Sequence, residues 1–206
     1  MIDRENIPDN KNGIPLEIYR EQFAAKDPAE MSRRSGVPYE NGVFKNVICS
    51  RPVELTYPDM ASRFTDTAEP TPANINILFA RLVMEGTFVQ QTGQFKAYTE
   101  MPWGEVYSQQ FNGRCIKRMA FSYGFDLEKF ERACLALGGV PAGKGDKSFD
   151  IEFLKGYTLR LILWEGDDEF PPASQMLFSD NFQYAFKAED MAVVGDIVLN
   201  MMKAVK

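Results

Sequence analysis

The sequence contains no histidine, and this absence excludes several kinds of chemistry. Without an imidazole, the chain cannot build a Ser-His-Asp or Cys-His nucleophile, a histidine metal site or a histidine-ligated haem. Any reaction would have to use carboxylates, lysine, tyrosine, cysteine or a bound cofactor. No motif identifies such a cofactor, so its identity stays open. A protein without catalytic activity is the favoured interpretation.

Cysteine is also scarce, with only Cys49, Cys115 and Cys134 in 206 residues. Three cysteines far apart form neither a disulfide framework nor the paired spacing of a zinc or iron–sulfur site. Cys115 and Cys134 fall on apolar stripes of expected helices, where a free thiol packs as a small hydrophobe. We therefore expect reduced, buried thiols.

Long apolar runs are missing, since none approaches the roughly 20 residues that a bilayer requires. Residues 1–8 carry charges where a signal peptide would need a continuous apolar core. Net charge is −6 and the pI is about 4.9, which repels phosphate backbones. We expect a cytoplasmic protein with no membrane and no nucleic-acid partner.

What the sequence does contain is a set of alternating apolar segments separated by helical stretches. The alternation and spacing of apolar residues predict strands near 43–50, 53–57, 94–99, 148–154 and 157–164, and helices near 16–25, 72–86, 106–123, 127–137 and from 188 onward. We predict an α+β fold: a mainly antiparallel sheet of about five strands with three to four packed helices. Residues 1–41 are expected to be an extended N-terminal segment with a short helix, and 42–206 a single α+β domain.

An acidic turn, Glu165-Gly-Asp-Asp-Glu169, follows the strongest predicted strand. Glu165, Asp167 and Glu169 would face roughly one side if the chain stayed extended, and could hold Mg²⁺, Mn²⁺ or Ca²⁺ through oxygen ligands. Crowded like charges would also raise a pKa and give a candidate general acid. The plainer alternative is a solvated turn whose charges prevent edge-to-edge strand pairing.

A second candidate lies in the segment 87–104, which is rich in glutamine, glycine and aromatic residues. Irregular loops of this kind on a rigid scaffold often carry binding groups. We predict a ligand site formed by Tyr98, Glu100 and Trp103 together with Trp164 beside the acidic turn. The alternative for Trp103 is that it simply covers the core.

Two further patterns are weaker. Residues 138–145 match the frame of a phosphate-binding loop, but Gly145 stands where Ser or Thr must bind Mg²⁺, and a helix precedes the loop instead of a strand. Arg114, Lys117 and Arg118 could attract an anion or an acidic partner. A solvated helix face explains these three cations more simply.

Several motifs resemble the domain of unknown function 3786 family, over roughly residues 78–201. They are Gly93-x-Phe-x-x-Tyr-x-Glu-Met-Pro-x-Gly104, Leu137-Gly-Gly139 with Gly145-Asp146, Trp164-x-Gly-Asp-x-Glu-Phe-Pro171, Leu177-Phe178 and Glu189-Asp190. The chain departs from the family pattern at Ser179, where relatives often have aspartate. The resemblance implies an uncharacterised protein of anaerobic bacteria and archaea, linked in some relatives to iron–sulfur or corrinoid modules.

These observations favour a cytoplasmic binding or accessory protein for a small-molecule ligand or a redox or corrinoid partner protein. One alternative is a metal-dependent enzyme with Asp167, Glu169 and Glu100 as oxygen ligands. Another is a structural subunit of a homo-oligomer, with the apolar terminal helix packed against a second copy. The sequence does not determine the oligomeric state.

Overall fold

The computed structural model describes residues 16–205, and the expected N-terminal extension lies partly outside them. The first half of the described chain contains α1 (Leu16–Ala24), α2 (Pro28–Ser35), β1 (Tyr39–Glu40), β2 (Val43–Ile48), β3 (Arg51–Thr56), β4 (Ser62–Phe64), α3 (Ala73–Glu85) and β5 (Phe95–Ala97). The second half contains α4 (Gly104–Phe111), a π-helical segment (Asn112–Lys117), α5 (Arg118–Tyr123), α6 (Leu127–Ala136), β6 (Val140–Pro141), β7 (Lys147–Leu154), β8 (Tyr157–Trp164), β9 (Ala173–Ser179), α7 (Phe182–Ala185) and α8 (Ala188–Ala204).

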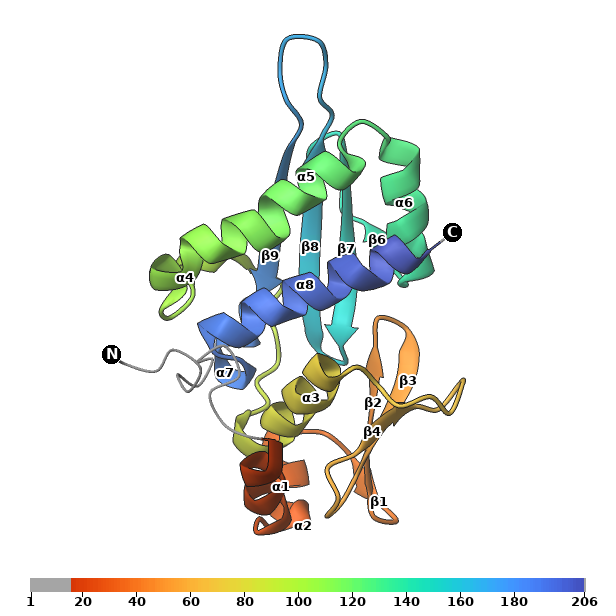
Figure 1. The fold of residues 1–206 in the computed structure, drawn as a ribbon. Coiled ribbons are helices and arrows are strands. Elements are labelled where there is room, and N and C mark those ends of the chain that lie inside the picture. The colour runs from red at the N-terminus through yellow and green to blue at the C-terminus, as the bar shows by residue number, and fades with distance from the viewer. Residues whose placement is uncertain (1–15, 206) are drawn as a thin grey trace, which may run out of the picture.

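The fold is a mixed α+β fold, as predicted, built on one antiparallel sheet (Figure 1). Within residues 16–205 the sheet has nine strands, ordered β4-β3-β2-β7-β8-β9-β5 with β1 beside β2 and β6 beside β7. The prediction of about five strands missed β9, whose apolar residues Met176, Leu177 and Phe178 are consecutive and do not alternate, and β1, β4 and β6, which have only two or three residues each. Segments that short show no alternation from which a strand can be predicted.

The sheet consists of two well-paired parts that meet at a narrow junction. Six residue pairs join β2 to β3 and seven join β7 to β8, but Ile48 opposite Leu154 is the single pair between β2 and β7. The Cys49 amide adds a hydrogen bond of 3.0 Å to the Phe153 carbonyl. Figure 1 shows β1–β4 with α1–α3 on one side of this junction and β5–β9 with α4–α8 on the other.

Helices α4, α5 and α8 cross the part of the sheet formed by β7–β9 (Figure 1). The crossing is close because Gly195 on α8 has no side chain: a Cβ there would lie 2.8 Å from the Cys115 sulfur and 2.9 Å from that of Met176. The apolar face of α8 therefore packs in the chain's own core and is not left over for a second copy. No helix in residues 16–205 is long and apolar enough to span a membrane.

The helices begin and continue through different local contacts. Asp126 caps α6, since its carboxylate accepts a hydrogen bond of 2.8 Å from the Lys129 amide. Pro72 occupies the N-cap position of α3, and the preceding Thr71 hydroxyl bonds that of Ser62. The helix predicted near 106–123 is interrupted by a π-helical segment that contains Gly113.

The described part of the N-terminal segment contributes to the core. Phe23, Met31 and Val37 are buried in the same apolar cluster as the strands, and the β1 residue Tyr39 pairs with Phe44. The expected short helix is α1. A boundary after residue 41 stays a prediction.

Candidate functional site

Two of the predicted ligand-binding residues have structural contacts. Tyr98 is only 3% exposed; its ring stacks on Phe111 with 4.0 Å between centroids, and its hydroxyl donates a hydrogen bond of 2.8 Å to the Ala188 carbonyl. Burial raises the pKa of Tyr98 well above its usual value. The Glu100 carboxylate accepts a 2.6 Å hydrogen bond from the Ala97 amide. Both side chains thus hold the turn between β5 and α4.

The two tryptophans are placed differently. Trp103 is 77% exposed and has a left-handed backbone (φ 65°) at the start of α4. It does not cover the core, so the simpler alternative for this residue was wrong. Trp164 ends β8 opposite Ala173 and is 38% exposed.

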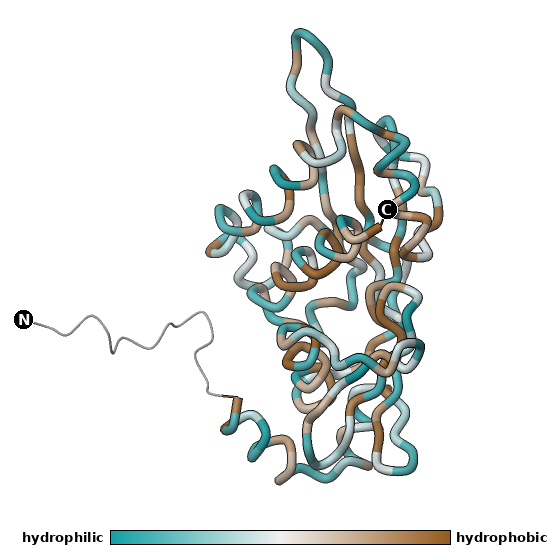
Figure 2. The backbone as a smooth tube through the Cα atoms, turned by 45° about the vertical axis from the view of Figure 1, so that its right-hand side comes forward, coloured by the Kyte–Doolittle hydropathy of each residue, from teal (hydrophilic) through white to brown (hydrophobic). Residues whose placement is uncertain are grey.

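The acidic turn lies at the tip of the β8–β9 hairpin, which projects from the body and is hydrophilic (Figure 2). The Asp167 carboxylate accepts hydrogen bonds of 2.8 Å and 2.7 Å from the amides of Glu169 and Phe170. These bonds lower the pKa of Asp167, which is the opposite of the increase expected for a general acid. Across residues 16–205, Glu165, Asp167 and Glu169 belong to no group of three or more His, Cys, Asp or Glu that could hold a metal ion.

The aromatic segment and the acidic turn lie at opposite ends of β9. Ala97, just before Tyr98, pairs with Leu177, whereas the turn ends before Ala173, four residues away. At about 3.3 Å per residue, this separates the two segments by about 13 Å before the hairpin extends further. The structure therefore does not bring Trp103 and Glu100 into one hollow with the acidic turn.

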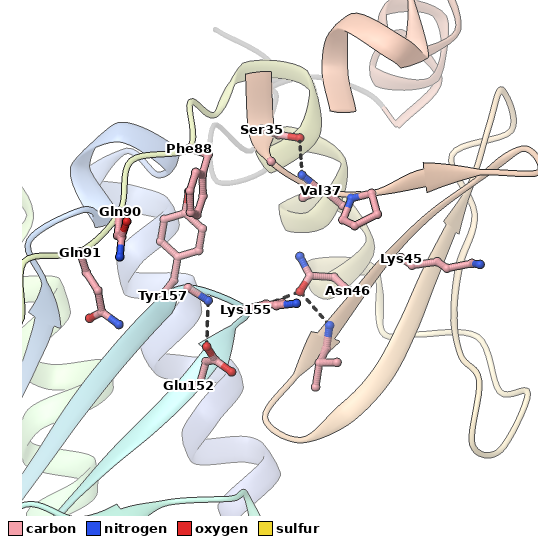
Figure 3. Close-up of a pocket in the computed structure, with 14 residues that line it drawn as sticks. Ser35, Val37, Lys45, Asn46, Phe88, Gln90, Gln91, Glu152, Lys155 and Tyr157 are labelled. Carbon is pink, nitrogen blue, oxygen red and sulfur yellow. Dashed lines mark hydrogen bonds between the residues drawn. The ribbon is translucent and has the colours of Figure 1, made fainter. Parts of the chain in front are cut away.

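A different cavity, of about 580 Å³, lies at the junction between the two parts of the sheet. Figure 3 shows its labelled residues, which come from the α2–β1 connection, β2, the segment after α3 and the β7–β8 hairpin. The lining comprises residues 35–38, 45–47, 88, 90, 91, 152 and 155–157. This volume is in the range of pockets that bind small molecules.

The ring of Phe88 lies between two glycines, one from each side of the cavity. A Cβ on Gly36 would lie 2.8 Å from the Phe88 ring, and a Cβ on Gly156 would lie 3.2 Å from it. Both glycines have positive φ, 71° and 89°, which residues with a side chain adopt rarely. Phe88 remains 48% exposed, so one aromatic surface stays available at the cavity.

A buried amide holds two walls of the cavity together. The Asn181 side chain donates hydrogen bonds of 2.9 Å to the Val89 carbonyl and 2.8 Å to the Gly156 carbonyl. Its own oxygen accepts from the Ser179 hydroxyl at 2.7 Å, and Ser179 accepts from the Thr158 amide at 3.1 Å. Ser179 therefore orients Asn181.

On the other side of Phe88, the backbone is fixed to helix α2. The Phe88 amide donates a hydrogen bond of 2.8 Å to the Arg34 carbonyl. The Arg34 guanidinium donates to the carbonyls of Val83, at 3.2 Å, and Met84 at the end of α3. The position of Phe88 is thus determined by both parts of the molecule.

The polar groups of the cavity are amides and two opposite charges. The Asn46 oxygen accepts from the Lys155 amide at 3.2 Å, which bridges the junction, and one Glu152 oxygen accepts from the Gly156 amide at 2.9 Å. No ion pair of Glu152 or of the Lys155 ammonium occurs in the described chain. Lys45 pairs with Glu40 at 3.0 Å and points away from the cavity (Figure 3).

This arrangement suits recognition of a polar molecule with a flat face. Gln90 and Gln91 add two further amides beside the Phe88 ring. Amides and two charges of opposite sign fix the orientation of a ligand, while an aromatic ring supplies apolar contact. The three cysteines are buried elsewhere in the core, and burial raises the pKa of Cys49 and Cys115 to about 12, so neither is a ready nucleophile.

The family model for Domain of unknown function (DUF3786) matches residues 27–201. The chain belongs to the DUF3786 family. The match begins earlier than the motifs around residues 78–201 suggested, so it includes α2, β2 and all the segments that line the junction cavity. No curated protein and no solved structure matches the chain.

Sequence reasoning had selected the segment 87–104 as a binding loop, and its first residues do line the cavity. Phe88, Gln90 and Gln91 line it, whereas the predicted ligand contacts Tyr98, Glu100 and Trp103 lie outside it. No pattern in the sequence indicates that the residues of the remaining walls line a cavity. Asn46, Glu152 and Lys155 are ordinary polar residues of strands and turns until the junction brings them together.

Proposed function

We propose that this member of the DUF3786 family is a binding protein for a small polar molecule with a planar group, and that the junction cavity is its site. One observation carries the proposal. A cavity of about 580 Å³ combines an exposed phenylalanine ring, several side-chain amides and two opposite charges, those of Glu152 and Lys155, that form no ion pair within residues 16–205. Such a cavity with a few convergent polar groups is the usual form of a ligand site.

The proposed role is that of a cytoplasmic accessory protein and not an enzyme. Supporting this, the residues at the cavity bind and orient but supply no activated nucleophile. We further propose that its ligand, or the partner protein that carries it, belongs to anaerobic corrinoid or iron–sulfur redox metabolism. This part of the proposal comes from the family resemblance alone.

A melting-temperature screen tests the proposal, because a ligand that binds the native state raises its stability. At about 100 times Kd the gain is about 2.7 kcal/mol. The library contains nucleotides, flavins, corrinoids, amino acids and heterocyclic metabolites. Both tryptophans lie away from the cavity, so hits are measured by calorimetry and not by intrinsic fluorescence.

Phe88→Ala removes the aromatic surface, and Lys155→Gln removes the positive charge. We expect each to weaken a genuine ligand at least about tenfold. Phe125→Ala is the matched control, because Phe125 is also exposed but does not line the cavity. A hit with unchanged affinity in both cavity variants, or a screen without any hit, would contradict the proposed site.

A further inference from the structure

A second cavity lies between α5, α6 and the end of α8, away from the junction. Its volume is about 610 Å³. Four cationic residues line it, namely Arg118, Lys129, Arg132 and Lys203, and none of the acidic side chains in residues 16–205 does. The whole chain carries a net charge of −6, so this concentration of positive charge is a local feature and not a general excess.

Much of this charge is not neutralised by neighbouring carboxylates. The Lys129 ammonium contacts only the Ser122 carbonyl, at 3.3 Å, and the Tyr123 ring, 5.2 Å from its centroid, among the described contacts. Arg132 lies 3.9 Å from Glu128, and both side chains are well exposed to solvent, so this pair is weak. Lys203 forms no ion pair within residues 16–205.

Arg118 is different, because its neighbours hold it in place. It donates hydrogen bonds of 2.6 Å to Asp196 and 2.6 Å to Asn200, both on α8. Asp196 is shared with Arg114 at 3.2 Å, so one carboxylate serves two guanidinium groups. The expectation that Arg118 belongs to a solvated helix face was therefore incomplete: it also joins α5 to α8 at this cavity.

Most of the remaining lining is apolar, apart from Ser122 and the hydroxyl-bearing ring of Tyr123. Leu199 and Met202 come from α8, Val205 follows its last residue, and Phe121 comes from α5. Phe121 is 64% exposed, an unusual position for a phenylalanine in a helix that otherwise buries its apolar residues. Guanidinium and ammonium groups around an apolar floor match a molecule that carries negative charge at one end and an aromatic ring at the other.

We propose that this second cavity binds a small organic anion with at least two negative charges and a planar apolar group, as in an aromatic phosphate. The phosphate would contact Lys129, Arg132 and Lys203, with Phe121 beside the ring. A concave site of this size encloses a small molecule, whereas an acidic protein surface would need a flat patch. This site is separate from the proposed ligand cavity and does not depend on it.

Calorimetry with three probes tests the proposal, namely ADP, inorganic pyrophosphate and adenosine. We expect ADP to bind below about 1 mM, pyrophosphate several-fold more weakly, and adenosine not measurably in this range. ADP affinity should fall several-fold between about 50 mM and about 200 mM salt, because the contacts are ionic. Pyrophosphate binding as tightly as ADP would refute the apolar part of the proposal.

Variants locate the binding. K129Q with R132Q should weaken ADP and pyrophosphate at least about tenfold. F121A should weaken ADP towards the pyrophosphate value and leave pyrophosphate unchanged. The control variants K144Q and F125A change exposed residues that line neither cavity and should change neither affinity. Failure of all three probes, or ADP binding that survives K129Q with R132Q, would overturn the second site without bearing on the first.

Discussion

The Asn181 amide offers the sharpest test of how the junction cavity is built. Its side chain is buried and donates to two carbonyls that belong to different walls, Val89 and Gly156. Asn181→Ala removes both donors at once and leaves the Ser179 hydroxyl without its acceptor. Few other single substitutions would loosen the cavity without touching its lining.

The expected cost follows from these contacts. A buried polar group left without a partner costs about 1–3 kcal/mol, and two carbonyls and one hydroxyl lose theirs. Val89 and Gly156 are partly exposed, so water replaces some of the lost bonding and the lower part of the range applies. We expect a loss of about 3 kcal/mol in the free energy of unfolding. With a urea m-value of about 2 kcal/mol/M, the midpoint falls by about 1.5 M.

Urea unfolding measures this loss, and hydrogen exchange locates it. Faster amide exchange should be confined to residues 87–92 and the β7–β8 turn, since Asn181 holds those segments together. Asn112→Ala is the matched control, because Asn112 is exposed and forms no side-chain hydrogen bond among the described contacts; its effect should stay within about 0.5 kcal/mol. A loss below about 1 kcal/mol for Asn181→Ala, or exchange that rises uniformly, would refute the reasoning.

Three further predictions concern other parts of the molecule. Gly104→Ala should lower the free energy of unfolding by about 3 kcal/mol, because the new Cβ would overlap the Tyr98 carbonyl. Gly113→Ala should raise it by up to about 1 kcal/mol, because no atom lies within 4 Å of the new Cβ. Urea unfolding measures both changes. The three thiols should not react with Ellman's reagent at about pH 8 until the protein unfolds, because all three are buried. Burial raises the pKa of Cys49 to about 12, so only about one Cys49 side chain in ten thousand is a thiolate at that pH. Fast labelling of the native protein would contradict this prediction. Burial raises the pKa of Asp190 above its usual value despite the Arg81 guanidinium at 2.7 Å, so the folded protein loses stability as pH rises from the usual aspartate value through the raised one. Over this interval the stability of Asp190→Asn should increase relative to that of the natural chain, and the opposite slope would show that the Arg81 ion pair outweighs desolvation.

The long elements were predictable because their residues repeat a pattern. β7 and β8 bury Phe149, Ile151, Leu159 and Leu161 at alternate positions, and Lys155 and Gly156 form the two-residue turn between them. The cap of α6 at Asp126 is likewise a local feature of the sequence. The strands β1, β4 and β6 were missed because a segment of two or three residues carries too little pattern to reveal a strand, even where its partner is close in the sequence.

The candidate site could not be predicted in the same way. Aromatic and acidic residues draw attention in a sequence, yet composition does not tell whether a tyrosine points inward. Tyr98, a predicted ligand contact, is stacked on Phe111 in the core. The carboxylate of Asp167, a predicted metal ligand or general acid, accepts hydrogen bonds from two amides of its own turn.

The junction cavity depends on a relation that no local pattern records. Residues near 46, 88 and 155 become neighbours through contacts between distant segments, chiefly the residue pair Ile48–Leu154 and the hydrogen bonds of Asn181 to Val89 and Gly156. The geometry of the site therefore depends on contacts that join different parts of the chain. A ligand that contacts β2 and the β7–β8 hairpin together would add bonds across the place where the sheet itself has fewest. Binding there should therefore stabilise the junction more than either part of the sheet alone.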